Sequence, residues 1–261
     1  MSAQASAIAQ DAAAAQAAEA TERAIRVDLA AAYRLVAMHG WDDLIYTHIS
    51  ARIPGPEHHF LINPYGLSFD EVTASSLLKI DVDGNKLSES AYSANKAGFV
   101  IHSAIHMARP DAICVWHMHT LAGMAVSAQE EGLLPAHMYS HNFWNRLSYH
   151  DFEGPSMRLA ERERLARSLS RNDALILRNH GLLTIGKTIP EAFIRFWRLN
   201  RACEIQLAAQ SSKLRIPAPE TCEASFRMGE DFLADQADLG ELEFAALLRK
   251  VQARGGAAYN Q

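Results

Sequence analysis

The chain has few cysteines and no long apolar run, and each absence excludes a class of protein. Three cysteines in 261 residues, odd in number and far apart, do not make a disulfide framework, which indicates a reducing compartment. No stretch reaches the roughly 20 apolar residues that a membrane-spanning helix needs. The first residues lack the basic start and apolar core of a signal peptide. We therefore expect a cytoplasmic protein.

An excess of basic charge is also missing. The formal net charge is -5 at pH 7, and charged residues of both signs make up 21% of the chain. Such a chain offers no basic surface for nucleic acid or for an anionic membrane. The hydrophobic share of 49% is ordinary for a globular domain. The composition therefore argues against nucleic acid and membranes as partners.

Composition and periodicity divide the chain into three segments. Residues 1–21 are an alanine-rich, low-complexity arm, expected to be disordered or helical only when docked. Residues 22–215 carry alternating helical and strand patterns without an internal repeat or a linker. Residues 216–261, which begin around Pro217 and Pro219, read as a helical C-terminal extension packed on the same domain.

Within the domain, apolar spacing and turn residues predict helices interleaved with short strands. Such a pattern favours a layered α/β domain with helices on both faces of the sheet. The expected helices cover about Glu22 to His39, Ile101 to Ala108, Leu121 to Gln129, Ser156 to Ser170 and Thr188 to Ala209. The expected strands cover about Ile45 to Ile53, Phe60 to Asn63, Leu77 to Asp81, Ala112 to Trp116, Ala174 to Leu177 and Leu182 to Ile185.

Two histidines at the end of a predicted strand are the first candidate metal ligands. His117 and His119 follow a short apolar run, and residues two apart on a strand point the same way. His180 lies at the end of another predicted strand, before a glycine. Three imidazoles would leave an open coordination position, as in a catalytic zinc site. A polar strand face and a turn histidine are the alternatives.

Other histidine pairs are weaker candidates, because the chain has twelve histidines and chance pairs must occur. His102 and His106 lie one helical turn apart and could chelate a metal, but buried polar or surface roles are favoured. The same holds for His137 and His141.

Taken together, four segments resemble the class II aldolase/adducin family, and the similarity runs from about Ile25 to Gln210. The resemblance implies a three-layer α/β/α fold with a central, mostly antiparallel or mixed sheet. It also implies a homotetramer with active sites between subunits. A divalent metal, usually zinc with manganese and iron as alternatives, would be held by His117, His119 and His180. The segments are HFLINPYGLSFDEVTASSLLKIDVDGN, AGFVIHSAIHMARPD, CVWHMHT and LILRNHGLLTIG.

The chain departs from the family's aldolases at one residue that their mechanism needs. The resemblance implies an acidic base about 11 positions before the RPD motif, where this chain has Gly98. Glycine cannot take a proton, and His48 is a candidate replacement acid or base. Tyr139 stands where the aldolases carry a tyrosine that acts as acid from a neighbouring subunit. Its alternative role is packing at a subunit boundary.

The positions that bind a sugar phosphate in the family's aldolases also differ. Tyr46, Thr47 and His48 stand where the resemblance implies small hydroxyl residues and an asparagine, and Tyr65 replaces a small residue in the turn that follows. A phosphorylated sugar is therefore disfavoured, and the sequence assigns no residue to substrate binding.

Three functions are open at this point. The first is a metal-dependent lyase that cleaves a small oxygenated substrate by an aldol or decarboxylative route. Decarboxylation needs no base to start it and so suits Gly98. The second is a non-catalytic scaffold similar to the adducin head. The third is oxygen chemistry on a ferrous ion, which three imidazoles also suit.

Overall fold

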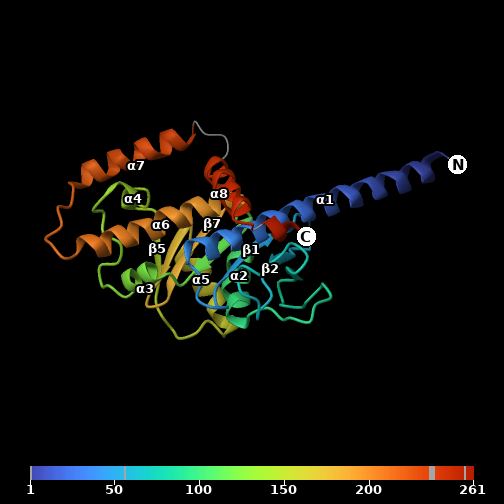
Figure 1. The fold of residues 1–261 in the computed structure, drawn as a ribbon, viewed down its shortest axis with the longest axis horizontal. Helices are drawn as coiled ribbons and strands as arrows, with labels where there is room; N and C mark the ends of the chain where they lie inside the picture. Colours follow the sequence, from blue (N-terminus) through green and yellow to red (C-terminus); the bar gives the residue numbers. More distant parts are fainter. Residues whose placement is uncertain (1, 56, 235–238, 256) are drawn as a thin grey trace.

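The computed structural model describes residues 2–55, 57–234, 239–255 and 257–261, which form an α/β fold around one sheet (Figure 1). The sheet has seven strands in the order β3-β2-β1-β4-β7-β6-β5. Among the described strands, only β5 and β6 pair in parallel. The strands are β1 (His48–Arg52), β2 (Phe60–Ile62), β3 (Leu78–Ile80), β4 (Cys114–Met118), β5 (Leu147–His150), β6 (Ala174–Leu177) and β7 (Gly181–Gly186).

Helices cover both faces of this sheet. One face packs against α1 and α6, with α8 behind them, and the other packs against α2 and α5. The shorter α3 and α4 contact α6, and α7 contacts α4. The helices are α1 (Ser2–His39), α2 (Lys96–Ala108), α3 (Leu121–Ser127), α4 (Met138–His141), α5 (Arg162–Leu169), α6 (Ile189–Ala209), α7 (Pro219–Ala234) and α8 (Glu241–Ala253), with 3₁₀ turns at Leu159–Glu161 and Ala257–Asn260.

Because side chains alternate along a strand, the two faces of the sheet carry different kinds of residue. On β4, Trp116 packs in the core with α1 and α6, whereas Val115 packs with α2 and α5. Because side chains alternate along a strand, His117 lies on the same face as Val115. On β1, Ile49 belongs to the core under α1, so His48 and Ser50 face α2. The α2 face of the sheet is therefore partly polar although it is fully buried.

The expected three-layer α/β/α fold with a mixed, mostly antiparallel sheet is confirmed. The helix expected from about Glu22 begins at Ser2, because the alanine-rich arm continues it without a breaker. In Figure 1, the N-terminal part of this helix projects away from the body. Strand β5 and the short α4 were not predicted, since neither carries a clear period.

Helix starts follow capping chemistry in one case and not in another. Thr188, where the sequence predicts the start of a helix, caps α6 by accepting a hydrogen bond from the backbone of Glu191. The helix expected from about Ser156 to Ser170 begins only at Arg162, so its predicted start is wrong. The hydroxyl of Ser156 donates to Glu161 Oε1 at 2.9 Å, and a 3₁₀ turn leads into α5.

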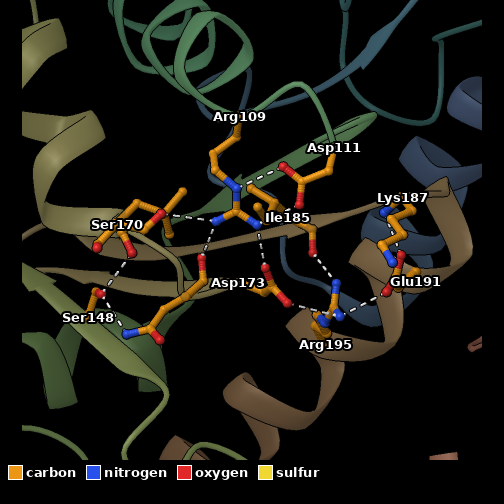
Figure 2. A network of polar contacts seen from close by, with 11 residues as sticks. Arg109, Asp111, Ser148, Ser170, Asp173, Ile185, Lys187, Glu191 and Arg195 are labelled. Atoms are coloured by element: carbon orange, nitrogen blue, oxygen red, sulfur yellow. Dashed lines mark hydrogen bonds and ion pairs between the residues drawn. The ribbon is translucent and has the colours of Figure 1, made fainter. Parts of the chain in front are cut away.

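An ion-pair network ties three elements together at one end of the sheet (Figure 2). Asp173, just before β6, accepts from Arg109 Nη2 at 2.9 Å and pairs with Arg195 Nη2 of α6 at 3.1 Å. Arg109 also binds Asp111, and Arg195 binds Glu191. Arg109 and Asp111 come before β4 in the chain, and Asp173 comes before β6. The network therefore lies at the end of the sheet where these two strands begin, opposite the end where they finish.

Among the described helices, none is both long and apolar enough to span a membrane.

Candidate metal centre

Three histidines meet where β4 ends and β6 turns into β7. His117 is the fourth residue of β4 and His119 follows the strand directly. His180 lies in the turn between β6 and β7. In this turn the next residue must be glycine, because a Cβ on Gly181 would lie 2.6 Å from the carbonyl oxygen of Met118. The antiparallel pairing of β4 with β7 thus brings together residues that are distant in the sequence.

Their geometry suits one cation. The three imidazole rings have centroids 4.8–4.9 Å apart, and one nitrogen of each lies within 4.8 Å of the others. His117 Nε2 and His119 Nε2 are 3.1 Å apart. Two nitrogens bound to zinc at 2.0–2.1 Å in a tetrahedral arrangement lie about 3.3 Å apart. The predicted ligands His117, His119 and His180 therefore form a compact cluster of nitrogen donors.

The outer nitrogens of two of these rings have partners that fix their tautomers. His117 Nδ1 lies 3.0 Å from the carbonyl oxygen of Leu182, which can only accept, so Nδ1 carries the proton. His119 Nδ1 lies 3.0 Å from Asp43 Oδ2, a carboxylate that accepts in the same way. Both Nε2 atoms then present lone pairs to each other, an arrangement that a cation between them stabilises. Such outer partners are typical of metal-binding histidines.

Burial keeps the imidazoles of His117 and His180 neutral. It lowers the pKa of His117 well below its usual range, with His180 and His119 adding to the effect. Burial also lowers the pKa of His180 to about 4, with help from His119 and His150. Metal ligands must be unprotonated, so the environment favours binding near neutral pH.

His48 fills the space beside Gly98, the position where the family resemblance implies an acidic residue. A Cβ on Gly98 would lie 2.4 Å from His48 Cδ2. His48 is paired with His117 in the register of β1 and β4, and the two ring centroids are 5.3 Å apart. Thr47, just before it, is buried with a φ of 72°, a strained conformation for a β-branched residue. The structure thus places a histidine at the edge of the histidine cluster.

Within one chain, no contact among the described residues links Tyr139 to this histidine cluster. It lies on α4, half-buried, with its ring 5.5 Å from that of Trp197 on α6.

Asp43 was missed by sequence reasoning, because it lies 76 residues before His119 in a segment without a strand period. Ser50 was also missed, although the alternation His48-x-Ser50 of a buried strand could have indicated a polar face. His102 and His106 are buried polar residues, the role that the sequence favoured.

Comparison with known proteins gives one consistent family. The family model described as Class II Aldolase and Adducin N-terminal domain matches residues 27–207. An aldolase II superfamily protein from Pseudomonas syringae is 45% identical, with a TM-score of 0.84 over 92% of this chain and 96% of that one. An L-fuculose 1-phosphate aldolase from Glaciozyma antarctica PI12 is 28% identical, with a TM-score of 0.81 and 94% of each chain covered.

A relative of another kind is alpha-adducin from Rattus norvegicus, which is 40% identical over 248 residues. The match covers 90% of this chain but 34% of that protein.

Proposed function

The chain belongs to the class II aldolase and adducin family, and from that premise we propose that it is a metal-dependent lyase. It would cleave a carbon–carbon bond of a small oxygenated substrate, by an aldol or a decarboxylative route. The observation that carries this proposal is the cluster of His117, His119 and His180, with two ring tautomers fixed by Leu182 and Asp43.

The proposed metal is zinc, with manganese and iron as alternatives, because three imidazoles suit each of them. When bound, such an ion would act as a Lewis acid and stabilise the negative charge left by bond cleavage. Asp43 would orient His119, and the carbonyl group of Leu182 would orient His117. Decarboxylation fits the absence of a carboxylate at Gly98, since it begins without removal of a proton.

The proposed substrate is not phosphorylated. Tyr46 and Tyr65, whose rings are 6.4 Å apart, occupy the positions at which the family resemblance implies small phosphate-binding residues. Both tyrosines are partly exposed, and neither brings a positive charge.

We also propose a homotetramer in which Tyr139 reaches the metal site of a neighbouring subunit and donates a proton to the carbanion. Exposed apolar side chains on α3, α4 and α7 support an assembly that covers them. They are Leu121, Met138, Met228 and Phe232, between 63% and 87% exposed. The free, buried cysteines Cys114, Cys203 and Cys222 support the cytoplasm as the compartment.

A scaffold role is the second candidate, favoured by the identity with alpha-adducin over most of this chain. In that case the histidine cluster would hold a metal for structure, and no substrate would be turned over. Oxygen chemistry remains a third candidate if the native metal is iron.

The test is the metal content of the untagged protein, measured by plasma mass spectrometry beside the His117→Ala/His119→Ala variant. His59→Ala is the matched control, because His59 lies outside the cluster and its side chain is partly exposed. About one zinc or manganese per chain, lost only in the double variant, would support the metal site and direct a screen of hydroxy-ketones and keto-acids, in which turnover would separate the lyase from the scaffold. Iron would redirect the screen to oxygenation. Unchanged metal content in the double variant would contradict the site.

A further inference from the structure

A continuous chain of buried polar groups runs from the end of α2 to the edge of the metal centre. His106 Nδ1 lies 3.0 Å from the carbonyl oxygen of Ala112, and His106 Nε2 lies 2.7 Å from Ser50 Oγ. Ser50 Oγ lies 2.5 Å from His102 Nδ1. His102 Nε2 lies 3.0 Å from His48 Nδ1. All four side chains are at most 3% exposed.

The carbonyl oxygen of Ala112 fixes the direction of the first bond. A carbonyl oxygen only accepts, so His106 Nδ1 must carry a proton and donate it. Whether Nε2 also carries one depends on the charge of His106. Burial, together with the nearby guanidinium group of Arg52, lowers the pKa of His106 to about 3. No carboxylate contacts the ring among the described residues. His106 is therefore neutral, and its Nε2 is an acceptor.

Each following proton is then determined. The hydroxyl of Ser50 donates to His106 Nε2, so Ser50 Oγ is left to accept from His102 Nδ1. A neutral His102 with its proton on Nδ1 has an acceptor at Nε2, which receives the proton of His48 Nδ1. The proton of His48 is thereby held on Nδ1, and its Nε2 keeps an unshared lone pair.

His48 Nε2 lies on the side of the ring away from His102 and has no hydrogen-bond partner within the described chain. Its ring is beside that of His117, yet His48 does not belong to the cluster of nitrogens within 4.8 Å of one another. The group is thus placed next to the proposed metal without being positioned as a ligand.

We propose that His48 Nε2 binds a hydroxyl group of the substrate as a fixed hydrogen-bond acceptor, with His102, Ser50 and His106 as positioning residues. This inference rests on the proposed function, because it assumes that substrate binds at the metal. The buried chain supplies no carboxylate to stabilise an imidazolium, so His48 accepts a hydrogen bond and does not have to take the proton.

A fixed acceptor selects among substrates. A hydroxyl group donates a hydrogen bond to it. An ionised phosphate or carboxylate has only acceptors, so its oxygen lone pairs would face the lone pair of His48 Nε2 and repel it. A site built around a buried hydrogen-bonding group also rejects analogues that lack its partner. The substrate would therefore carry a hydroxyl group beside the oxygens that bind the metal, and no anionic group at that place.

The first measurement reads the tautomers by nitrogen NMR of the metal-free full chain labelled with ¹⁵N-histidine at pH 7.5. Assignment uses single-histidine variants. We expect His48, His102 and His106 to be neutral, with the proton on Nδ1. Ser50→Ala, an isosteric change, removes the acceptor of His102 Nδ1, so His48 and His102 should then show a mixture of both tautomers. Any other tautomer of His48 in the wild-type chain would overturn the proposal.

The second measurement uses two zinc chelators, glycolohydroxamate and acetohydroxamate, which differ by one hydroxyl group. On the zinc-loaded protein the hydroxylated probe should bind roughly tenfold more tightly, as one hydrogen bond to a buried acceptor allows. The ratio should fall to about one in His48→Leu and fall in part in Ser50→Ala, and it should persist in His59→Leu. An unchanged ratio in His48→Leu would overturn the proposal.

Failure of the proposed function gives a different pattern. A chain that binds neither zinc nor manganese nor iron would contradict the lyase, while the tautomers of the metal-free protein would still decide whether His48 is a fixed acceptor. A large zinc-induced shift of the His48 Nε2 resonance would make this residue a fourth ligand and would also overturn its role as substrate acceptor.

Discussion

Asp43 is the residue on which the orientation of the His119 ring depends. Its carboxylate, half-exposed in the segment before β1, holds His119 Nδ1 at 3.0 Å. Replacing Asp43 with asparagine keeps the shape but removes the charge that makes the ring a better donor to a metal. Because loss of such outer partners typically weakens metal binding by about 10- to 100-fold, Asp43→Asn should bind zinc less tightly within that range.

Competition with a chromophoric chelator would measure this change. Asp42→Asn is the matched control, since Asp42 is the neighbouring acid, is exposed and makes no contact with the histidine cluster. Equal zinc affinity in the two variants would show that Asp43 does not support the site.

Gly98 is required by the position of His48. A Cβ at residue 98 would lie 2.4 Å from His48 Cδ2, and His48 cannot move aside because its Nδ1 is bound to His102. Gly98→Ala should therefore lower the free energy of unfolding by about 1–3 kcal/mol, as overpacking does, although alanine is the better helix former. Urea unfolding would measure the effect, and Gly98→Ala/His48→Ala should recover part of it.

The control for Gly98 is a second helical glycine in open surroundings. Around Gly229 on α7, the described residues would offer an added Cβ one contact within 4 Å, Asn142 Oδ1 at 3.8 Å. Gly229→Ala should stabilise the fold by about 0.5–1 kcal/mol. The change in free energy of unfolding should therefore have opposite signs in Gly98→Ala and Gly229→Ala, which separates crowding at His48 from helix propensity. A stabilising Gly98→Ala would show that His48 does not crowd this position.

At the scale of single residues, the sequence was enough to predict the three clustered histidines but not their partners. His117 and His119 share a strand end, and His180 precedes a glycine, so local patterns together with the family resemblance pointed to them. Asp43 and Leu182 act through contacts across the fold, for which the sequence carries no local period. His48 was a candidate for its place in the sequence, but its tautomer depends on Ser50, His102 and His106 together.

At the scale of elements, the regular spacing of apolar residues predicted most of the sheet and its covering helices. Segments without such spacing were not predicted. Strand β6 was predicted with its observed bounds, because a short apolar run between turn residues is typical of a buried strand. Strand β5, with alternating partly buried residues, depends on its parallel neighbour β6 for its conformation. The start of α1 was wrong because an alanine-rich segment is equally compatible with a disordered arm and a helix.

The network around Asp173 should stabilise the joints between β6, α6 and the start of β4 without affecting the metal site. Asp173 pairs with Arg109 and Arg195, but it is 39% exposed, so solvent weakens both pairs. We expect Asp173→Asn to lower the free energy of unfolding by about 1 kcal/mol, less in 1 M salt, with zinc affinity unchanged. Urea unfolding and zinc titration would measure the two effects.

Glu163→Gln is the comparison for this prediction. It also removes one carboxylate, but the ion pair of Glu163 within the described part of the chain is with Arg167 of the same helix, α5, and Glu163 is 81% exposed, so its effect should be near zero. If Asp173→Asn and Glu163→Gln had the same effect, the network would contribute no more than an ordinary surface ion pair.

For the whole molecule, the buried histidines set the pH dependence of stability. Burial lowers the pKa of His106 to about 3 and that of His102 well below its usual range. Between pH 6.5 and about 3, the unfolded chain therefore binds protons that the folded chain does not. Stability is fully present above pH 6.5 and is lost as the pH falls, by about 1.4 kcal/mol per pH unit for each such histidine.

Urea unfolding of the metal-free protein at pH 7.5, 6 and 5 would measure this slope. His106→Gln should reduce the slope by about one histidine's share, whatever its effect on stability at pH 7.5. A stability that stayed flat down to pH 5 would mean that these histidines are protonated in the folded state, and it would also remove the basis for the assigned tautomers.

The proposed assembly makes a prediction that no single chain can fulfil. If Tyr139 acts on the metal site of a neighbouring subunit, each active site draws its metal ligands from one chain and its tyrosine from the next. Tyr139→Phe and His117→Ala/His119→Ala should each abolish most activity on a substrate found by the screen. Refolded together in equal amounts, they should regain about a quarter of wild-type activity, because random mixing gives that share of intact sites around a head-to-tail ring. Mixed assemblies that stay inactive, while light scattering shows intact tetramers, would place Tyr139 in packing. The ring contact with Trp197 would then be its whole role.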